Sequence, residues 1–302
     1  MLNLSCAALR PQAPLTVEAR ALAAYLGLAV GDALGATVEF LTPKEIQQQI
    51  GVHRNLTGGG WLKLRPGVVT DDTTMSLALG DAILACQGRV EPLAAAQAFD
   101  RWMRGKPVDI GNTVRRNLVR FRQTGEPHAL PSEHDAGNGA AMRIGAVGFL
   151  AKTEEQVRRW SHAITATSHN SPEAIKAAEA TALTVFHLRN GLSKAKLRKL
   201  IEEQYYALDG LSVEYLHETL KKDDSSQGTM PVAFTVFFES DDFETAIRNA
   251  IYIGGDTDTI GAIVGTWAQI IYPIPNDITE RVITRLDPKI RQCIYNFDST
   301  VR

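Results

Sequence analysis

Apolar residues recur at intervals of three and four along this chain, and that spacing narrows its possible folds more than any other feature. One such helical face comprises Leu22, Leu26, Ala29, Val30 and Ala33. The alternation typical of strands is scarce, and in the main ambiguous segment, residues 232–238, branched and aromatic side chains suit either a strand or a buried helix. We assign this segment to a helix and predict an all-α fold.

Residues that start and stop helices strengthen this prediction. Ser171 and Pro172 are preferred at a helix N-terminus, and Asn190-Gly191 is typical of a left-handed helix end. Ser193 then predicts the cap of another helix. The segment that starts at Ser171 therefore predicts two consecutive helices.

Polar or glycine-rich stretches at residues 51–67, 125–137 and 208–228 predict long loops between helices. A chain of 302 residues could form two average domains, but no linker or shift in composition divides it. We therefore predict one compact domain over residues 1–302, with residues 1–16 as a candidate flexible extension.

Composition excludes several classes of protein. A hydrophobic content of 44% with 22% charged residues is typical of a globular core and argues against disorder. The formal net charge of -2 provides no basic field for nucleic acid or an anionic membrane. The longest apolar run, about residues 260–274, is too short for a bilayer span and predicts a buried helix. Scattered Cys6, Cys86 and Cys293 form no Cys-x-x-Cys pair and predict a reducing, cytoplasmic location.

Two acidic clusters each precede an apolar helix. The first contains Thr70, Asp71 and Asp72, and the second contains Asp256, Asp258 and Thr259. Helix capping explains either cluster alone, because Thr and Asp satisfy free N–H groups and suit the positive end of the helix dipole. Two such clusters, the second preceded by the flexible pair Gly254-Gly255, are harder to explain by capping. The alternative is that both helix starts converge on a ligand.

Convergence would bring several carboxylates together, and they repel each other in a folded interior unless cations are bound. Their oxygen ligands suit hard ions, while the absence of a His-Glu-x-x-His motif and of paired cysteines argues against zinc. We therefore predict a binuclear site for two divalent cations, Mg²⁺ or Mn²⁺.

Two weaker signals lie between the acidic clusters. Gly137-Asn138-Gly139 lacks the preceding strand and the closing Gly or Ala of a dinucleotide fingerprint, but its glycines suit a phosphate at a helix N-terminus. His169 lies just before a predicted helix, and it suits a structural loop histidine and a ligand contact equally well.

Six segments, spread over nearly the whole chain, together resemble the ADP-ribosylglycohydrolase family. These segments are residues 27–40, 58–61, 70–73, 107–113, 135–143 and 254–259. Their combination is far more specific than any one motif. The resemblance implies an all-α fold with a binuclear metal site in a central cleft.

The same resemblance implies roles for individual residues. The metal ligands would be Thr70, Asp71, Asp72, Asp256, Asp258 and Thr259. Glu39 and Asp109 would lie beside the metals and the substrate ribose, and these two carboxylates and Asp258 are the candidates for the catalytic base. The ADP-ribose cleft would be lined by Asp135, Asn138, Gly139 and His169.

One region departs from the family pattern. Residues 192–228 lack the aromatic segment expected to stack on adenine. Tyr205, Tyr206 and Tyr215 are the candidates to replace it, and packing is the alternative role of these side chains.

Members of the family hydrolyse the bond between ADP-ribose and a modified side chain, which is an arginine of dinitrogenase reductase in the bacterial type most similar to this chain. Two cations can position the anomeric carbon and activate a water while a carboxylate accepts the water's proton. The resemblance therefore implies an ADP-ribosylarginine hydrolase in the regulation of nitrogen fixation. It also implies a PII-type regulator and reversible membrane association through that partner.

Two other functions stay open at this stage. The same chemistry could act on ADP-ribosylated serine or on a small ADP-ribose conjugate. The chain could instead be a non-catalytic module that binds ADP-ribose or confers immunity. The intact acidic clusters favour a catalytic function.

Overall fold

The computed structural model describes residues 17–51, 53, 55–220, 223–286 and 288, without the side chains of residues 17–24, 84, 279, 282 and 283. The side chain of Leu22, both Cys6 and Cys293, and the candidate extension 1–16 lie outside that description. The described part contains helices and no strand, so the predicted all-α fold is confirmed. The helices are α1 (Val17–Gly35), α2 (Pro43–Gln49), α3 (Asp71–Ala85), α4 (Pro92–Arg104), α5 (Asn112–Thr124), the 3-10 helix η2 (Asn138–Arg143), α6 (Gly145–Leu150), α7 (Glu154–Thr165), α8 (Pro172–Arg189), α9 (Lys194–Gln204), α10 (Val213–Thr219), α11 (Ser226–Phe238), α12 (Phe243–Tyr252), α13 (Thr257–Ile271) and α14 (Asn276–Arg285).

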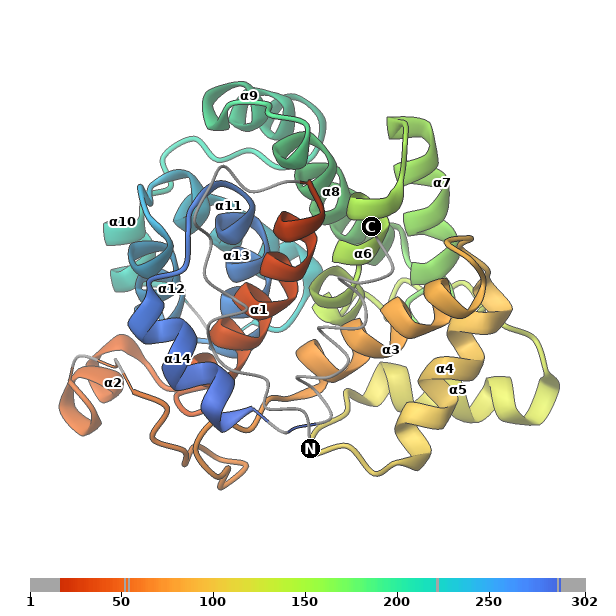
Figure 1. Cartoon of the computed structure of the whole chain (residues 1–302), viewed down its shortest axis with the longest axis horizontal. Coiled ribbons are helices and arrows are strands. Elements are labelled where there is room, and N and C mark those ends of the chain that lie inside the picture. The colour runs from red at the N-terminus through yellow and green to blue at the C-terminus, as the bar shows by residue number, and fades with distance from the viewer. Residues whose placement is uncertain (1–16, 52, 54, 221–222, 287, 289–302) are drawn as a thin grey trace.

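Helices α1 and α13 pack against each other at the centre of the molecule (Figure 1). Their interface lacks side chains at the closest points: a Cβ on Gly27 would overlap the Gly265 carbonyl, and a Cβ on Gly31 would overlap that of Gly261. Close backbone approach of this kind requires glycine. Since Gly35 meets Thr257 in the same way, the C-terminal end of α1 lies at the N-terminal end of α13.

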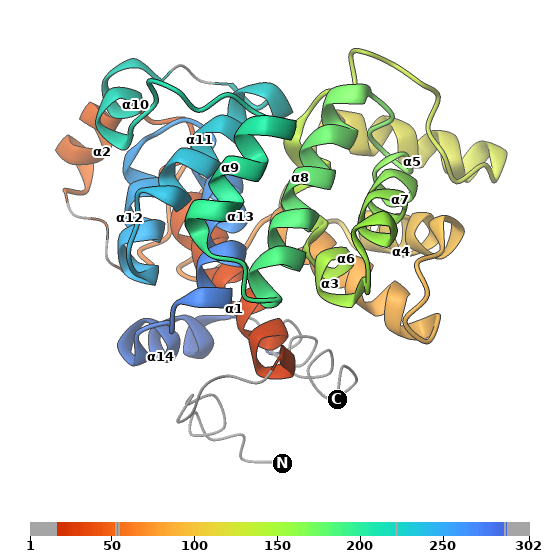
Figure 2. The ribbon, with the colours of Figure 1, turned by 90° about the horizontal axis from the view of Figure 1, so that it is seen from above.

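The remaining helices surround this central pair. Helix α13 also packs on α8, α11 and α12, and its Trp267 is fully buried in a stack with Phe234, at 4.6 Å between ring centroids. Figure 2 shows α10 and α12 on one side of the central pair and α4, α5 and α7 on the other. The apolar run in α13 is therefore a core helix, as predicted, and no described helix combines the length and apolar character of a membrane span.

Several predicted helix ends are confirmed by hydrogen bonds. The Ser171 hydroxyl accepts from the Ala174 N–H at 3.2 Å, Gly191 has the positive φ of 83° at the end of α8, and Ser193 caps α9. Residues 232–238 lie in α11. The prediction of a long loop at residues 208–228 was wrong in part, because Ser212 caps the short helix α10 within it.

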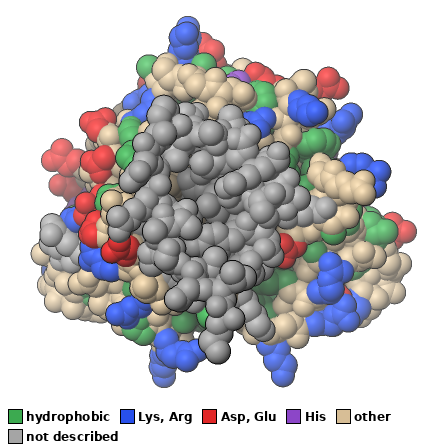
Figure 3. Space-filling model, viewed as in Figure 1, with side chains coloured by type: hydrophobic (Ala, Val, Ile, Leu, Met, Phe, Trp, Pro, Cys, Tyr) green, Lys and Arg blue, Asp and Glu red, His purple; other side chains and the backbone are tan. Residues whose placement is uncertain are grey.

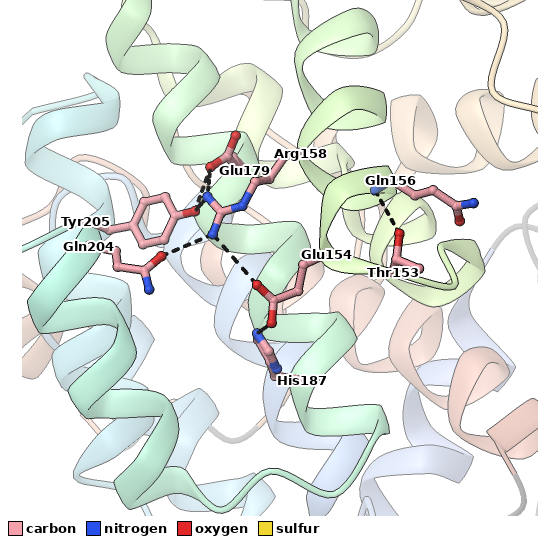
Figure 4. A network of polar contacts seen from close by, with 8 residues as sticks. All are labelled: Thr153, Glu154, Gln156, Arg158, Glu179, His187, Gln204 and Tyr205. Carbon is pink, nitrogen blue, oxygen red and sulfur yellow. Dashed lines mark hydrogen bonds and ion pairs between the residues drawn. The ribbon is translucent and has the colours of Figure 1, made fainter.

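A polar network holds α7, α8 and α9 together (Figure 4). We call its five residues, Glu154, Arg158, Glu179, His187 and Tyr205, the paired network. Arg158 Nη1 donates to Glu179 Oε1 at 2.5 Å and to the Tyr205 hydroxyl at 2.6 Å, and the Tyr205 hydroxyl donates to Glu179 at 2.6 Å. His187 Nε2 lies 3.3 Å from Glu154 Oε1. Each carboxylate of the network therefore faces a basic side chain.

This network bears on the tyrosines considered for adenine stacking. Tyr205 belongs to the paired network, and Tyr206 is buried with the Lys176 ammonium 4.5 Å from its ring centroid. Tyr215 is 50% exposed, so it is the one of the three whose ring has room for a ligand.

Candidate active site

The N-terminal ends of α3 and α13 meet, and their side chains interact. Asp72 at the start of α3 and Asp256 before α13 both lie within hydrogen-bonding reach of the Thr259 side chain. Asp256 occupies the cap position of α13, yet its side chain makes no capping hydrogen bond. Capping therefore does not explain this carboxylate.

Asp32 on α1 provides the hydrogen bonds that the start of α3 needs. Its carboxylate accepts from the Thr70 N–H at 2.9 Å and from the Thr73 N–H at 3.1 Å. It also accepts from the hydroxyls of Thr70 at 2.9 Å and Thr73 at 2.5 Å. Because Asp32 satisfies these donors, the Asp71 and Asp72 carboxylates are not required as caps.

Glu39 reaches the same place from the turn after α1. Two backbone hydrogen bonds join this turn to the loop before α13: Phe40 N–H to the Gly255 carbonyl at 2.7 Å, and Gly255 N–H to the Leu41 carbonyl at 3.2 Å. The Trp61 indole N–H donates to Glu39 Oε2 at 2.6 Å. Glu39 is buried, whereas Trp61 is 54% exposed. A buried carboxylate is thus held under an exposed aromatic ring.

Several buried carboxylates gather at this junction, and we call four of them the acidic cluster: Glu39, Asp72, Asp256 and Asp258. Oxygen atoms of Glu39, Asp256 and Asp258 all lie within 4.8 Å of one another. Within the described residues, no Lys, Arg or His forms an ion pair with any member of the cluster.

The carboxylates of this region hold protons more tightly than usual. Burial raises the pKa of Glu39 to about 8, the hydrogen bond from Trp61 opposes that shift, and the charge of Asp256 reinforces it. Burial and neighbouring carboxylates also raise the pKa of Asp71 to about 7 and that of Asp72 well above its ordinary value. Such shifts are expected where like charges are buried together.

The donor set fits divalent cations. Asp72 Oδ1 is buried and has no hydrogen-bond partner among the described residues. An unsatisfied buried oxygen is costly unless a ligand contacts it. Because the surrounding ligands are carboxylate and hydroxyl oxygens, the chemistry suits hard ions such as Mg²⁺, Mn²⁺ or Ca²⁺.

Asp109 borders the acidic cluster from the loop between α4 and α5. Its Oδ1 accepts from the Ile110 N–H at 2.7 Å, which fixes the side chain against its own loop. Its charge contributes to the raised pKa values of Asp71 and Glu39, and the Gly111 backbone N–H hydrogen-bonds Asp71. The structure thus brings Asp109 to the metal-ligand candidates.

Two further residues that the resemblance implied for the site, Asn138 and Asp135, are held by neighbouring side chains. Asn138 Nδ2 donates to Asp256 Oδ2 at 2.6 Å and to the Thr229 hydroxyl at 2.8 Å, so this side chain orients a member of the acidic cluster. Asp135 is 2% exposed, accepts from Asn117 Nδ2 at 2.9 Å and forms an ion pair with Arg116. Both of its carboxylate oxygens are therefore engaged by α5.

His169 belongs to a hydrogen-bonded chain that starts at the buried Arg143. Arg143 donates to the Gly139 carbonyl at 2.5 Å and to the Ser168 hydroxyl, and the Ser168 oxygen lies 2.8 Å from His169 Nδ1. Arginine can only donate, so His169 Nδ1 is the one acceptor for the Ser168 hydroxyl hydrogen among the described residues. We therefore assign the His169 proton to Nε2, next to Gly139.

Burial supports a neutral imidazole at this position. It lowers the pKa of His169 well below the ordinary value, and the charges of Arg143 and Arg116 lower it further. A Cβ on Gly139 would lie 3.3 Å from His169 Nε2, so glycine leaves room beside this nitrogen. His169 therefore offers a neutral N–H donor beside the Gly137 to Gly139 loop.

The sequence did not predict roles for four residues of the site. Asp32, Trp61 and Arg143 lie inside segments that carried the family resemblance, and Ser168 is adjacent to His169. Asp32 and Arg143 are buried charged residues, which is a signal that becomes visible only once the fold is known. For Asp32, Trp61 and Arg143, their place inside these motif segments was the sequence signal that pointed to the site.

Three comparisons with known proteins indicate the same family. The sequence model of the ADP-ribosylglycohydrolase family matches residues 13–298. The "ADP-ribosyl-[dinitrogen reductase] glycohydrolase" of Rhodospirillum rubrum is 39% identical over 284 residues, which covers 92% of this chain and 93% of that protein. The "ADP-ribosylarginine hydrolase Tri1" of Pseudomonas putida (strain GB-1) is 28% identical over 87% of this chain and 74% of its own length.

A solved structure shows the same fold. The "ADP-ribosylglycohydrolase-related protein complex" contains a chain that superposes with a TM-score of 0.76 at 29% sequence identity. The match covers 95% of this chain and 99% of that one. Since the family model and the Rhodospirillum rubrum relative extend over nearly the whole sequence, this chain belongs to the ADP-ribosylglycohydrolase family.

Proposed function

We propose that this chain is a divalent-cation-dependent hydrolase that removes ADP-ribose from a modified arginine of a protein. The observation that carries the proposal is the acidic cluster, four buried carboxylates without a basic partner among the described residues. The names of the two relatives support arginine as the acceptor and ADP-ribosylated dinitrogenase reductase as the leading protein substrate.

Two cations, Mg²⁺ or Mn²⁺, would be held by Thr70, Asp71, Asp72, Asp256, Asp258 and Thr259. When bound, they would orient the ribose hydroxyls and lower the pKa of the attacking water. The unpartnered Asp72 Oδ1 and the Asp256 side chain without a capping role support this assignment. Asn138 and Asp32 would hold Asp256 and Thr70 in place.

Hydrolysis breaks the bond between the anomeric carbon and a guanidine nitrogen, adds the water oxygen to that carbon, and transfers one water proton to the departing guanidine. The candidates to accept and pass on this proton are Glu39, Asp109 and Asp258. Burial and the neighbouring carboxylates raise the pKa of Glu39 in the metal-free chain. Bound cations would lower that pKa again and leave the Glu39 carboxylate ionised and able to accept the proton. The same negative charges would stabilise the positive charge that develops at the anomeric carbon.

Asp135, Asn138, Gly139 and His169 would position ADP-ribose. The Nε2–H of His169 would donate to an oxygen of the ligand, because Nδ1 is occupied by Ser168. Arg143 acts through Ser168 and Gly139, and it is a positioning residue in this scheme.

A substrate panel tests the proposal. Purified protein loaded with Mn²⁺ or Mg²⁺ would be incubated with ADP-ribosyl-arginine, an ADP-ribosyl-serine peptide and ADP-ribosylated dinitrogenase reductase, and released ADP-ribose would be measured by chromatography. We expect release from the two arginine-linked substrates, cation dependence, and loss of release in Asp72→Ala.

The same panel separates the alternatives. Release from the serine peptide but not from the arginine substrates would move the activity to another acceptor. Tight ADP-ribose binding by calorimetry without release from any substrate would indicate a non-catalytic binding module and overturn the proposal.

A further inference from the structure

Basic residues are concentrated in one segment of this weakly acidic chain. Residues 101–124 contain seven Lys and Arg residues and the single acidic residue Asp109, whereas the whole chain has a formal net charge of -2. The segment comprises the last turn of α4, the following loop and the whole of α5. Figure 3 shows Lys and Arg side chains over α4 and α5, at the right of the view.

Helix α5 directs these charges outward. Its buried residues are Val114, Asn117, Leu118 and Phe121. The remaining surface of the helix carries the exposed residues Arg115, Arg116, Val119 and Arg122, and we call these four residues the basic face. The side chains of Arg116 and Arg122 are 60% and 47% exposed although each contacts a buried carboxylate. Arg115 is exposed and has no ion pair within the described part of the chain.

The basic face borders the candidate active site. Arg116 and Asn117 of α5 both contact Asp135, which is one of the residues assigned to the ADP-ribose cleft. The backbone N–H of Gly111, directly before α5, hydrogen-bonds Asp71. A protein that places a modified arginine in the site would therefore bring its neighbouring surface to α5.

The composition of this region is that of a protein-binding surface. Val119 lies within the basic face and is 38% exposed, and two exposed apolar residues flank the helix, Val108 at 53% and Leu130 at 63%. Interfaces between proteins are enriched in arginine around apolar contacts. Helix α5 has 13 residues and is about 20 Å long, so its basic face is longer than the diphosphate of one ADP-ribose molecule.

On the basis of the proposed function, we propose that the basic face of α5 docks an acidic surface that surrounds the modified arginine on the target protein. Complementary charge across an interface accelerates association and selects partners. The negative charge of ADP-ribose occupies the site itself, and the basic face extends the recognition to the protein that carries it. The target class is therefore a protein whose ADP-ribosylated arginine lies among Asp and Glu residues.

Matched peptides test this proposal without knowledge of the natural target. Two peptides would carry the same ADP-ribosylated arginine, flanked in one by four glutamates and in the other by four lysines, with ADP-ribosyl-arginine as the substrate without flanks. At low salt we expect kcat/KM to be about 10-fold higher for the acidic peptide than for the basic one. Salt should reduce that difference, because exposed charges are screened.

The double variant Arg115→Glu, Val119→Glu changes the charge of the basic face by three units and leaves the cleft contacts of Arg116 and Asn117 in place. A matched control, Ala195→Glu, Lys196→Glu, makes the same change on exposed residues of α9. We expect the first variant to lose the preference for the acidic peptide and the control to keep it. All three proteins should cleave ADP-ribosyl-arginine equally, and their thermal midpoints would verify folding.

Each other outcome overturns the docking proposal in a recognisable way. An equal loss of cleavage on ADP-ribosyl-arginine would assign the basic face to the nucleotide, and an unchanged preference would leave it without a role in docking. If the double variant lost binding to phosphatidylserine vesicles while no peptide preference existed, the face would belong to a membrane. If the wild-type protein cleaved none of the substrates, the proposed function itself would have failed.

Discussion

The paired network and the acidic cluster are both groups of carboxylates among packed helices, and they differ in what faces each carboxylate. In the paired network, Glu179 contacts Arg158 and Glu154 contacts His187. In the acidic cluster, Glu39 and Asp256 face other carboxylates. The first arrangement stabilises the fold by itself, whereas the second raises the free energy of the folded chain until a cation binds. This difference indicates that the acidic cluster, and not the paired network, is suited to bind a ligand.

The strongest test of this contrast is to remove one charge from the acidic cluster. Asp256→Asn keeps the side-chain shape and a contact with Asn138, but it removes an anionic ligand. We expect kcat/KM for ADP-ribosyl-arginine to fall about 1,000-fold, equivalent to about 4 kcal/mol. The matched change Glu154→Gln in the paired network should alter kcat/KM by less than about 2-fold, since Glu154 faces His187 and lies outside the acidic cluster. Residual activity above one tenth of wild type in Asp256→Asn would contradict the metal assignment.

Cation binding and pH provide the next largest effect. Because the folded-state pKa of Glu39 is about 8 and its ordinary value is 4.5, the folded, metal-free chain keeps a proton that the unfolded chain releases. Its stability should therefore fall as pH rises from 4.5 to 8. Mn²⁺ at about 100 times its Kd should restore about 2.7 kcal/mol. Chemical denaturation at pH 6 and pH 8, with chelator and with Mn²⁺, measures both the loss of stability and the stabilisation by Mn²⁺. A smaller stabilisation by Mn²⁺ at pH 8 than at pH 6 would refute the prediction.

The converse change breaks the paired network. Arg158→Met keeps an apolar stem of similar length but leaves Glu179 and Tyr205 without the guanidinium. Since the Arg158 side chain is 37% exposed, solvent weakens the loss, and we expect the free energy of unfolding to fall by about 1 kcal/mol. Urea denaturation measures this. Activity and the stabilisation by Mn²⁺ should stay unchanged, and a loss of either would show that the two clusters are coupled.

The smallest expected effect concerns a third arrangement, in which the neutral Ser168 hydroxyl separates Arg143 from His169. Ser168→Ala should raise KM for ADP-ribosyl-arginine about 3-fold and change kcat less, because one orienting hydrogen bond is lost. Nitrogen-15 NMR of the imidazole provides the specific check. We expect a single tautomer protonated at Nε2 in wild type and a mixture in Ser168→Ala, and identical spectra would refute the assigned chain.

Much of the fold could be predicted from local signals. Helical spacing, Ser171, Gly191 and Ser193 correctly indicated helices and their ends, because these preferences act over a few residues. The short helix α10 was missed, since its cap, Ser212, lies in a polar stretch that resembles a loop. Propensity is weakest in such short segments.

The composition of the site could be predicted in part. The aspartates at both helix starts were visible as repeated patterns, but their caps could not be assigned, because Asp32 reaches Thr70 from a different helix. The chain from Arg143 to His169 also depends on residues that are far apart in sequence. Contacts of this kind follow from packing, which local patterns do not describe.

The glycine contacts between α1 and α13 make this protein sensitive to substitutions outside the candidate active site. None of these glycines carries a reactive atom, yet they set how closely the turn with Glu39 approaches the helix start at Asp256. A methyl group at Gly31 would force the two backbones apart and would shift both ends of that contact. In a saturation-mutagenesis screen, inactive variants should therefore cluster along a stripe of chemically inert positions in addition to the cleft. The geometry of the candidate active site therefore depends in part on the absence of side chains at these glycines.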